Sequence, residues 1–441
     1  MKRNPNMSKT RPVFAGYVVL WLAATLGLRA QSLSPIQQLG KSIFVDQNLS
    51  INQNQSCAAC HAPEVGWTGP IGQINAGGAV YEGSIAGRFG NRKPPSSAYA
   101  TPSPVLHFVM DKKDAVFIGG NFWDGRATGE GLGNPAADQA LGPFLNPAEQ
   151  ALPDSACVVH RVCTAGGYPT TFEQVWGADA CDIVWPADVD SVCGTEGGVV
   201  GLSPADRAKA GEDYQRIGLS IAAYEASSEV NAFSSKFDYF LARMVKLTRK
   251  ERMGFNLFKG KGKCAKCHVF GPGPNGEPPL LTDFTYDNLG VPRNPDNPFY
   301  VSPSNPAGIN WVDLGLGEFL SGRPDYAGYA EDNEGKQKVP TLRNVALRPN
   351  GSFVKAYGHN GYFKSLRGIV HFYNTRDVKP TCPDPFTREA DALAAGCWPV
   401  AEVQDNVNTS ELGNLHLTPD QEDAIVAFLE TLSDGFPLPG P

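Results

Sequence analysis

Two short motifs, CAACH at residues 57–61 and CAKCH at residues 264–268, decide how this 441-residue chain is interpreted. Each has the form C-x-x-C-H, in which two thiols add across the vinyl groups of a haem and the adjacent His binds its iron. A zinc ribbon needs its two C-x-x-C pairs only about 15–20 residues apart, and a thioredoxin-like site would leave both His unexplained. The motifs therefore predict two covalent c-type haems, held by Cys57, Cys60, Cys264 and Cys267 and ligated by His61 and His268.

The composition agrees with a folded chain that wraps cofactors. Hydrophobic residues make up 41% of it, which is too many for a disordered protein, whereas its 48 Gly and 36 Pro are too many for a plain helical bundle. Two haems would supply large apolar surfaces around which loops can pack. The net charge of −7 argues against a nucleic-acid-binding protein, which would carry a basic stripe.

The beginning of the chain has the pattern of a secretory signal. Basic residues between positions 2 and 11 precede an apolar run over 13–28, and Leu28-Arg29-Ala30 offers a cleavage site after Ala30. The run is shorter than the ~20 residues of a membrane-spanning helix, which disfavours an uncleaved anchor. We expect a signal peptide over residues 1–30 and a periplasmic mature protein without a membrane segment, in a compartment where disulfides persist.

Helical patterns flank both motifs. An amphipathic helix is expected over 34–44 ahead of the first motif and a similar one over 248–258 ahead of the second, so one unit occurs twice. A long joining helix is expected over 213–242. A terminal helix over 417–432 would begin with Thr418 as cap and Pro419 at its first position.

The remaining stretches predict a mainly α fold with little β-structure. Residues 73–104 and 270–335 are rich in Gly, Pro and Asn and are interpreted as loops. We expect two cytochrome c-like haem domains with long loops, an N-terminal one over residues 31–235 and a C-terminal one over residues 236–441.

Several ordered blocks resemble the bacterial dihaem cytochrome c peroxidase family, which includes the MauG-type enzymes. Besides the two C-x-x-C-H motifs, the blocks are FWDGRA at 122–127, Gln139 with Pro143 and NPAE at 146–149, VPTLRNV at 339–345, HNG at 359–361 and FYN at 372–374. Their order covers nearly all of the mature sequence. The resemblance implies that the first haem is the peroxidatic one and the second transfers electrons.

The resemblance also implies roles for three side chains. Glu149 and Gln139 match the family's catalytic residues on the far side of the first haem, where a carboxyl can move the proton that O–O cleavage requires. Glu149 taken alone would be read as a solvated surface residue. Trp123 matches a Trp that lies between the haems and is thought to carry electrons, although a core Trp without a redox role is the alternative. Arg126 and Arg343 are expected to hold haem propionates or other carboxylates.

The first haem is expected to have an open or water-bound face. Typical peroxidases of the family close this face with a His in the loop after the first motif, but residues 62–106 contain no His. His107, Met110 and His160 are the remaining candidates. We therefore predict that no reductive activation is required.

The second haem is expected to have a Tyr as its far ligand. Ordinary family members use a Met, and this chain has no Met after Cys264. The equivalent position is Tyr373, as in the MauG-type enzymes, and a phenolate would stabilise oxidised iron. His371 is the alternative, since residues two apart on a helix face about 200° apart and only one of the pair can face the iron.

Calcium is doubtful as a further cofactor. The family binds calcium through an Asn side chain and two backbone carbonyls, but the Asn position matches Tyr99 here, and the segment before His359 is longer.

Six cysteines lie outside the motifs and predict three disulfides in an exported chain. Fifteen pairings can be drawn, of which proximity in sequence favours Cys157–Cys163, Cys181–Cys193 and Cys382–Cys397. A metal site lacks supporting spacing.

Three functions follow from the resemblance, in this order. The first is a periplasmic peroxidase that reduces hydrogen peroxide with electrons from a small cytochrome c or cupredoxin. The second is a MauG-like enzyme that uses peroxide to oxidise Trp or Tyr residues of a partner protein. The third is a dihaem electron carrier without catalysis, against which Glu149 and Gln139 argue.

Overall fold

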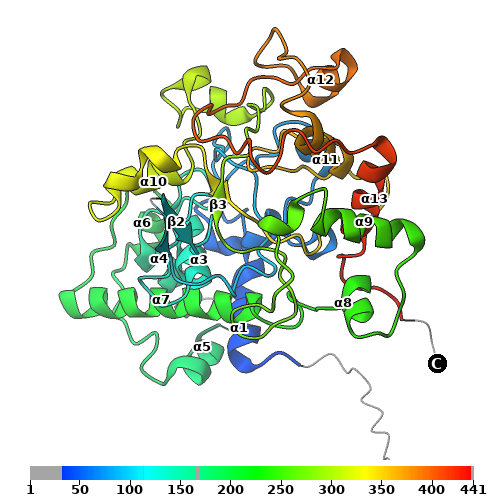
Figure 1. The fold of residues 1–441 in the computed structure, drawn as a ribbon. Coiled ribbons are helices and arrows are strands. Elements are labelled where there is room, and N and C mark those ends of the chain that lie inside the picture. The colour runs from blue at the N-terminus through cyan, green and yellow to red at the C-terminus, as the bar shows by residue number, and fades with distance from the viewer. Residues whose placement is uncertain (1–31, 113, 165–167, 439–441) are drawn as a thin grey trace, which may run out of the picture. The chain divides into compact units, whose positions relative to one another are not determined.

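The computed structural model describes residues 32–112, 114–164 and 168–438, and its compact unit is mainly helical (Figure 1). The signal peptide expected over residues 1–30 lies outside the described residues. The α-helices are α1 Pro35–Val45, α2 Gly72–Ala76, α3 Pro135–Leu145, α4 Ser155–Thr164, α5 Tyr168–Trp176, α6 Val189–Cys193, α7 Pro204–Glu225, α8 Lys236–Leu241, α9 Arg249–Lys259, α10 Leu316–Ser321, α11 Leu366–Thr375, α12 Glu389–Ala395 and α13 Pro419–Glu430. Long connecting segments join them, and within the described ranges no helix has the length and hydropathy needed to cross a bilayer.

The β-structure consists of two antiparallel two-stranded ribbons. Strands β1 (His107–Asp111) and β2 (Asp114–Ile118) pair with His107 opposite Ile118, and β3 (Tyr286–Asp287) pairs with β4 (Gln337–Lys338). The prediction of a mainly α fold with little β-structure is confirmed. The division into haem domains at residue 235 stays a prediction.

The helix ahead of the first motif, α1, packs against α7. Ile43 and Phe44 are buried on this face, and Gly40 approaches α7 so closely that a Cβ there would lie 1.9 Å from the Ser220 carbonyl oxygen. Phe44 also meets Tyr224 edge to face, with ring centroids 5.6 Å apart. The first motif is thereby fixed to a two-helix core.

The helix ahead of the second motif, α9, packs against α13 in the same manner. A Cβ at Gly254 would lie 1.8 Å from the Ala424 carbonyl oxygen, and Phe258 and Phe428 are fully buried between the helices. Thr248 caps α9 and Thr418 caps α13, each in a capping box. The expected repetition of one helix–motif unit is observed, and Pro419 occupies the first turn of α13 as predicted.

The expected long helix over 213–242 is wrong in its bounds. Helix α7 starts earlier, because Ser203 caps it and Pro204 takes its first turn, and it ends at Glu225. A separate helix, α8, then begins after Ser235, whose side chain accepts from the Asp238 amide. The stretch 270–335 is not loop throughout, since it contains α10 and several 3-10 turns.

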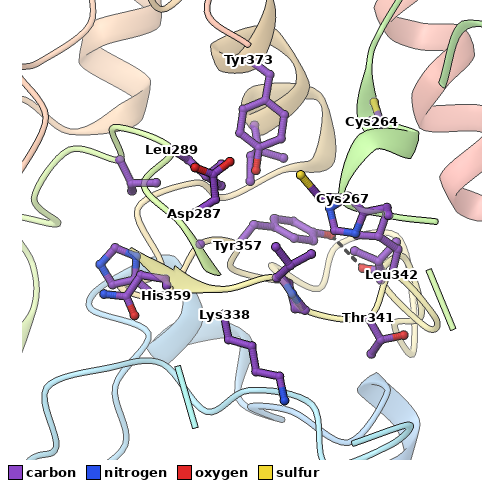
Figure 2. Close-up of a pocket in the computed structure, with 18 of the residues that line it drawn as sticks. Cys264, Cys267, Asp287, Leu289, Lys338, Thr341, Leu342, Tyr357, His359 and Tyr373 are labelled. Atoms are coloured by element: carbon purple, nitrogen blue, oxygen red, sulfur yellow. Dashed lines mark hydrogen bonds between the residues drawn. The ribbon is translucent and has the colours of Figure 1, made fainter. Parts of the chain in front are cut away.

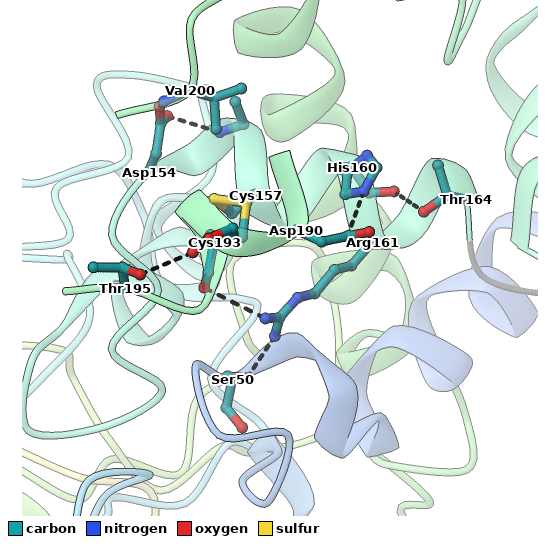
Figure 3. The surroundings of a disulfide bond; sticks show 12 residues. Ser50, Asp154, Cys157, His160, Arg161, Thr164, Asp190, Cys193, Thr195 and Val200 are labelled. Atoms are coloured by element: carbon teal, nitrogen blue, oxygen red, sulfur yellow. Dashed lines mark hydrogen bonds and ion pairs between the residues drawn. A yellow bond between two sulfur atoms is a disulfide. The ribbon is translucent and has the colours of Figure 1, made fainter. Parts of the chain in front are cut away.

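Two of the three predicted disulfides are also wrong. The bonds are Cys157–Cys193, Cys163–Cys181 and Cys382–Cys397, so only the last was predicted correctly. Figure 3 shows the first of them. Cys157 and Cys163 both lie on α4, where six residues separate them by about 9 Å along the axis, beyond the reach of a disulfide. Each therefore bonds to a cysteine on the following segment.

The disulfide segment is further tied to the α1 end of the molecule. Arg161 of α4 donates to the backbone oxygens of Asn48 and Ser50, and Figure 3 shows its guanidinium between Ser50 and Cys193. His160 meets Asp190 at 3.0 Å. His160 is not among the residues that line the cavity beside the first motif.

Candidate functional site: two haem-attachment cavities

The first motif forms a tight turn that presents its reactive groups together. Residues Cys57–Ala59 make a 3-10 turn, and the His61 amide donates to the Cys57 carbonyl at 3.0 Å. His61 Nδ1 lies 3.1 Å from the Trp67 carbonyl, which can only accept, so Nδ1 carries the proton and Nε2 is left as the ligand atom. Burial lowers the pKa of His61 to about 4, which keeps the imidazole neutral as metal binding requires.

A cavity of about 1080 Å³, including the space at its mouth, adjoins this turn. It brings together the residues expected there: Cys57, Cys60, His61, Trp123, Arg126, Gln139, Pro143 and Glu149. Apart from His61, none of its described lining residues is a His or a Met. His107 and Met110 are exposed on β1 and lie outside the lining, which agrees with an open first haem.

Glu149 is held by the segment that follows α3. The side-chain amide of Asn146 donates to Glu149 Oε1 at 2.8 Å. The backbone N–H of Glu149 donates to the backbone carbonyl of Asn146. Burial raises the pKa of Glu149, while Arg126 and the Asn146 amide oppose that rise. A carboxyl of this kind exchanges a proton at a higher pH than a solvated Glu.

The second motif repeats the arrangement. Cys264–Lys266 make a 3-10 turn, and His268 Nδ1 lies 2.8 Å from the Leu281 carbonyl, which again leaves Nε2 as the ligand atom. The adjoining cavity, of about 1740 Å³ with its mouth, is lined by both Cys264 and Cys267 (Figure 2). Burial lowers the pKa of His268.

The structure places Tyr373 and His371, the two candidate far ligands of the second haem, in different surroundings. Tyr373 lines the second cavity, and Figure 2 shows it projecting from α11 toward Asp287 and Cys267. His371 is outside the lining, and its Nδ1 lies 2.9 Å from Glu422 Oε1. Burial raises the pKa of Tyr373, so its phenol stays neutral unless a cation such as ferric iron binds the oxygen.

Trp123 lines both cavities, as do Lys93 and Pro95, and it is the aromatic side chain among these three. Its Nε1 donates to the Lys93 carbonyl at 2.8 Å, and its ring centroid is 6.4 Å from that of His359. The indole is thus fixed at the wall between the two sites.

The two arginines contact carboxylates of the chain itself. Arg126 donates to Asp124 at 2.6 Å and lies 3.8 Å from the centroid of the Phe122 ring. Arg343 forms two hydrogen bonds with Asp238, at 2.8 and 3.0 Å, and a third with the Pro279 carbonyl. Both also line a cavity, Arg126 the first and Arg343 the second.

Three lysines in the cavity walls, of which Lys93 and Lys355 are buried and Lys338 is half-buried, were not anticipated from the sequence. Lys355 Nζ donates to the carbonyls of Val65, Asn344 and Leu347 at 2.8, 2.7 and 3.1 Å. Lys93 and Lys338 bond to hydroxyl and carbonyl oxygens in the same region. Burial lowers the pKa of Lys93 to about 8 and that of Lys338 to about 7. No local pattern distinguishes these lysines from exposed ones, so the sequence offered no signal for them.

The residues present fit a haem at each motif. Among the described residues the four motif cysteines are the ones outside disulfides, each pair adjoins a cavity, and each His directs Nδ1 to a backbone carbonyl. The cavities have apolar walls, as a macrocycle requires. At the position expected for calcium, the Tyr99 hydroxyl donates to Asp434 and accepts from the Phe233 amide.

Comparison with known proteins gives a consistent result. A family model described as di-haem cytochrome c peroxidase matches residues 34–246. The methylamine utilization protein MauG of Paracoccus denitrificans is 34% identical over 397 residues, which cover 90% of this chain and 88% of MauG. Cytochrome c551 peroxidase of Nitrosomonas europaea is 28% identical over 334 residues, which cover 76% of this chain and 71% of that protein.

A solved structure shares the fold over almost the same length. The diheme peroxidase BthA from Burkholderia thailandensis E264 superposes with a TM-score of 0.66 at 27% identity and covers 92% of this chain and 88% of its own. The resemblance drawn from the ordered sequence blocks is confirmed by both kinds of comparison.

Proposed function

Because the chain belongs to the di-haem cytochrome c peroxidase family and is an oxidoreductase with two haem groups, we propose that it reduces hydrogen peroxide with electrons from a small redox protein. Two electrons and two protons convert each peroxide to two waters. A haem with an open iron position supplies the site where peroxide binds and is reduced. The main support for the proposal is Glu149, because it is a carboxyl with a raised pKa in the cavity beside the first motif.

Glu149 moves the proton in this proposal. Its carboxylate takes a proton from one peroxide oxygen and returns it to the other, which leaves as water. The Asn146 amide fixes Oε1 and leaves Oε2 free for this exchange. Gln139, on α3, orients the substrate by hydrogen bonding.

Trp123 is proposed to pass electrons between the sites, since it lines both cavities. Tyr373 is proposed as the far ligand of the second iron, supported by its place in the cavity wall and by the contact of His371 with Glu422. A phenolate ligand would stabilise the oxidised metal and lower the potential of that haem. Calcium stays doubtful, since the Tyr99 hydroxyl is already paired with Asp434.

Both haems are proposed to be covalent c-type haems in an exported protein. The free motif cysteines and the three disulfides support this, since disulfides persist in oxidising compartments such as the periplasm. Haem staining that persists on a denaturing gel of the periplasmic fraction tests it. Haem lost on denaturation, or protein found only in the cytoplasm, would contradict it.

A second function is favoured by the likeness to MauG and by Tyr373. A MauG-like enzyme would use peroxide to oxidise Trp or Tyr residues of a partner protein, without a small electron donor. A non-catalytic electron carrier ranks third, since it would have no use for Glu149.

One experiment separates the three functions. One equivalent of peroxide is added to the diferric holoprotein, and the visible spectrum is followed with and without a reduced small redox protein. Rapid donor oxidation supports the peroxidase, whereas a long-lived oxidised state that the donor does not discharge supports the MauG-like function. An unchanged spectrum would leave only the electron carrier.

A further inference from the structure

Positive charge is concentrated in one short segment of an otherwise acidic chain. Between residues 243 and 266 there are nine Lys and Arg and one acidic residue, Glu251, although the whole chain carries a net charge of −7. We call these nine residues the basic surface: Arg243, Lys246, Arg249, Lys250, Arg252, Lys259, Lys261, Lys263 and Lys266. The segment comprises α9 and its flanks and leads directly into the second motif (Figure 1).

All nine side chains are exposed, and little of their charge is neutralised. Within the described residues the one ion pair they form is between Lys266 and Glu411, at 3.7 Å. Glu251 is engaged by Lys236, which lies outside the basic surface, at 2.7 Å. The neighbouring α13 carries four acidic residues: Asp420 and Glu430 are exposed, Glu422 is buried against His371, and Asp423 pairs with Arg367, so none of them forms an ion pair with the basic surface. The surface therefore keeps a strongly positive potential.

Apolar side chains lie among these charges. Met244 and Met253 are 59% and 39% exposed, and Leu241 is 43% exposed. A shallow groove runs here, lined by Arg249, Arg252, Met253, Asn256, Leu257 and Lys261. Arg and Met are enriched in protein interfaces, and exposed apolar groups ringed by charge are typical of a docking surface.

The basic surface adjoins only the second attachment site. Lys263 precedes Cys264, and Lys266 lies between Cys264 and Cys267. Around the first motif, by contrast, residues 42–87 contain no Lys or Arg and three acidic residues. The positive charge therefore distinguishes the second attachment site from the first, whose motif is otherwise similar.

We propose that the basic surface is the docking site for a small redox protein with an acidic face, which delivers electrons to the second haem. This rests on the proposed peroxidase function and adds the charge of the partner. Two reduced donors each lose one electron, and the two electrons and two solvent protons reduce one peroxide to two waters. Opposite charge would guide a short-lived encounter and raise the association rate, as steering does in other transient complexes.

The test uses the holoprotein with two probes, a reduced acidic cupredoxin and a reduced basic mitochondrial-type cytochrome c. Binding is measured by calorimetry at low and high ionic strength, and donor oxidation is measured separately with peroxide. We expect the acidic cupredoxin to bind and react at least tenfold better at low salt, with the preference lost at high salt.

A charge-reversed variant, Arg249→Glu/Lys250→Glu, localises the effect. Both positions are in the first turn of α9, where acidic residues are favourable, so the helix should be retained. The control is Lys112→Glu/Lys209→Glu, which makes the same charge change on the β1–β2 turn and on α7, where Lys209 pairs with Asp179 at 3.5 Å. We expect the first variant to lose about tenfold in affinity for the cupredoxin and the control to retain wild-type affinity.

Equal binding of the two probes, absent cupredoxin binding, or equal losses in the variant and its control would overturn the proposal. Failure of the peroxidase function has a different signature, because a spectrum of the diferric protein that peroxide does not change would be seen without any donor. If the protein reacts with peroxide but binds the acidic and the basic probe equally well, the docking proposal is refuted and the peroxidase function is not.

Discussion

Replacing Glu149 with Gln separates its proton transfer from its packing. Glu149 Oε1 accepts a hydrogen bond from the Asn146 amide at 2.8 Å, and the carbonyl oxygen of a Gln can accept the same bond. The variant keeps the shape of the cavity but cannot take up the peroxide proton. General acid–base catalysis contributes about 10²–10⁴-fold, or about 3–5 kcal/mol in the barrier, and we expect a loss of this size.

The assay is stopped-flow spectroscopy of the diferric holoprotein with excess peroxide, with the second-order rate constant measured over a range of pH. Burial raises the pKa of Glu149, so the wild-type rate should rise with pH through a value above the ordinary 4.5 as the carboxylate forms. The rate of the Gln variant should be low and flat over that range. Glu64→Gln, an exposed change in the same half of the chain, is the control. A Glu149→Gln rate within threefold of wild type would refute the role of this carboxyl.

Three further predictions concern other groups around the cavities. Tyr373→Phe should change the absorption and electron paramagnetic resonance spectra of the second haem, whereas His371→Gln should leave them unchanged; the reverse result would make His371 the ligand. Lys355→Met should lower the free energy of unfolding by about 2–4 kcal/mol in a denaturant titration, because three buried carbonyls lose their donor, and an unchanged midpoint would contradict this. Arg126→Gln should move the acid limb of the peroxide pH profile to higher pH, since Arg126 lowers the pKa of Glu149 and its removal raises that pKa; a shift to lower pH would exclude this coupling.

The two candidate haem sites could be proposed from the sequence because their chemistry is local. Two thiols and a His within five residues suffice to indicate a c-type haem, and the structure adds a cavity beside each turn. The convergence of Gln139 and Glu149 on the first cavity was expected only through the family resemblance. Nothing in their own neighbourhood distinguishes them from surface residues.

The disulfides show where proximity in sequence misleads. Cys157 and Cys163 are close in the chain, but α4 holds them apart along its axis, so each bonds across to another segment. The pairing depended on the course of residues 168–193, which no local pattern encodes. Cys382 and Cys397 flank α12 and neither lies on it, so no helix holds them apart, and their pairing was predicted correctly.

Helix bounds were predictable where a cap marked them. Thr418 followed by Pro419 gave the start of α13, and Ser203 followed by Pro204 offered the same signal for α7, which the apolar periodicity alone misses. The burial of Lys355 could not be predicted, because its three acceptors come from Val65 and from the 344–347 segment, far apart in sequence.

The spectrum of the diferric holoprotein, recorded before and after one equivalent of hydrogen peroxide, tests the central claim most directly. We predict a first haem with a high-spin, open ferric iron, because among its described lining residues His61 is the sole His and no Met is present. Addition of peroxide should then change the spectrum without prior reduction. Two low-spin ferric haems that do not respond to peroxide would contradict the account.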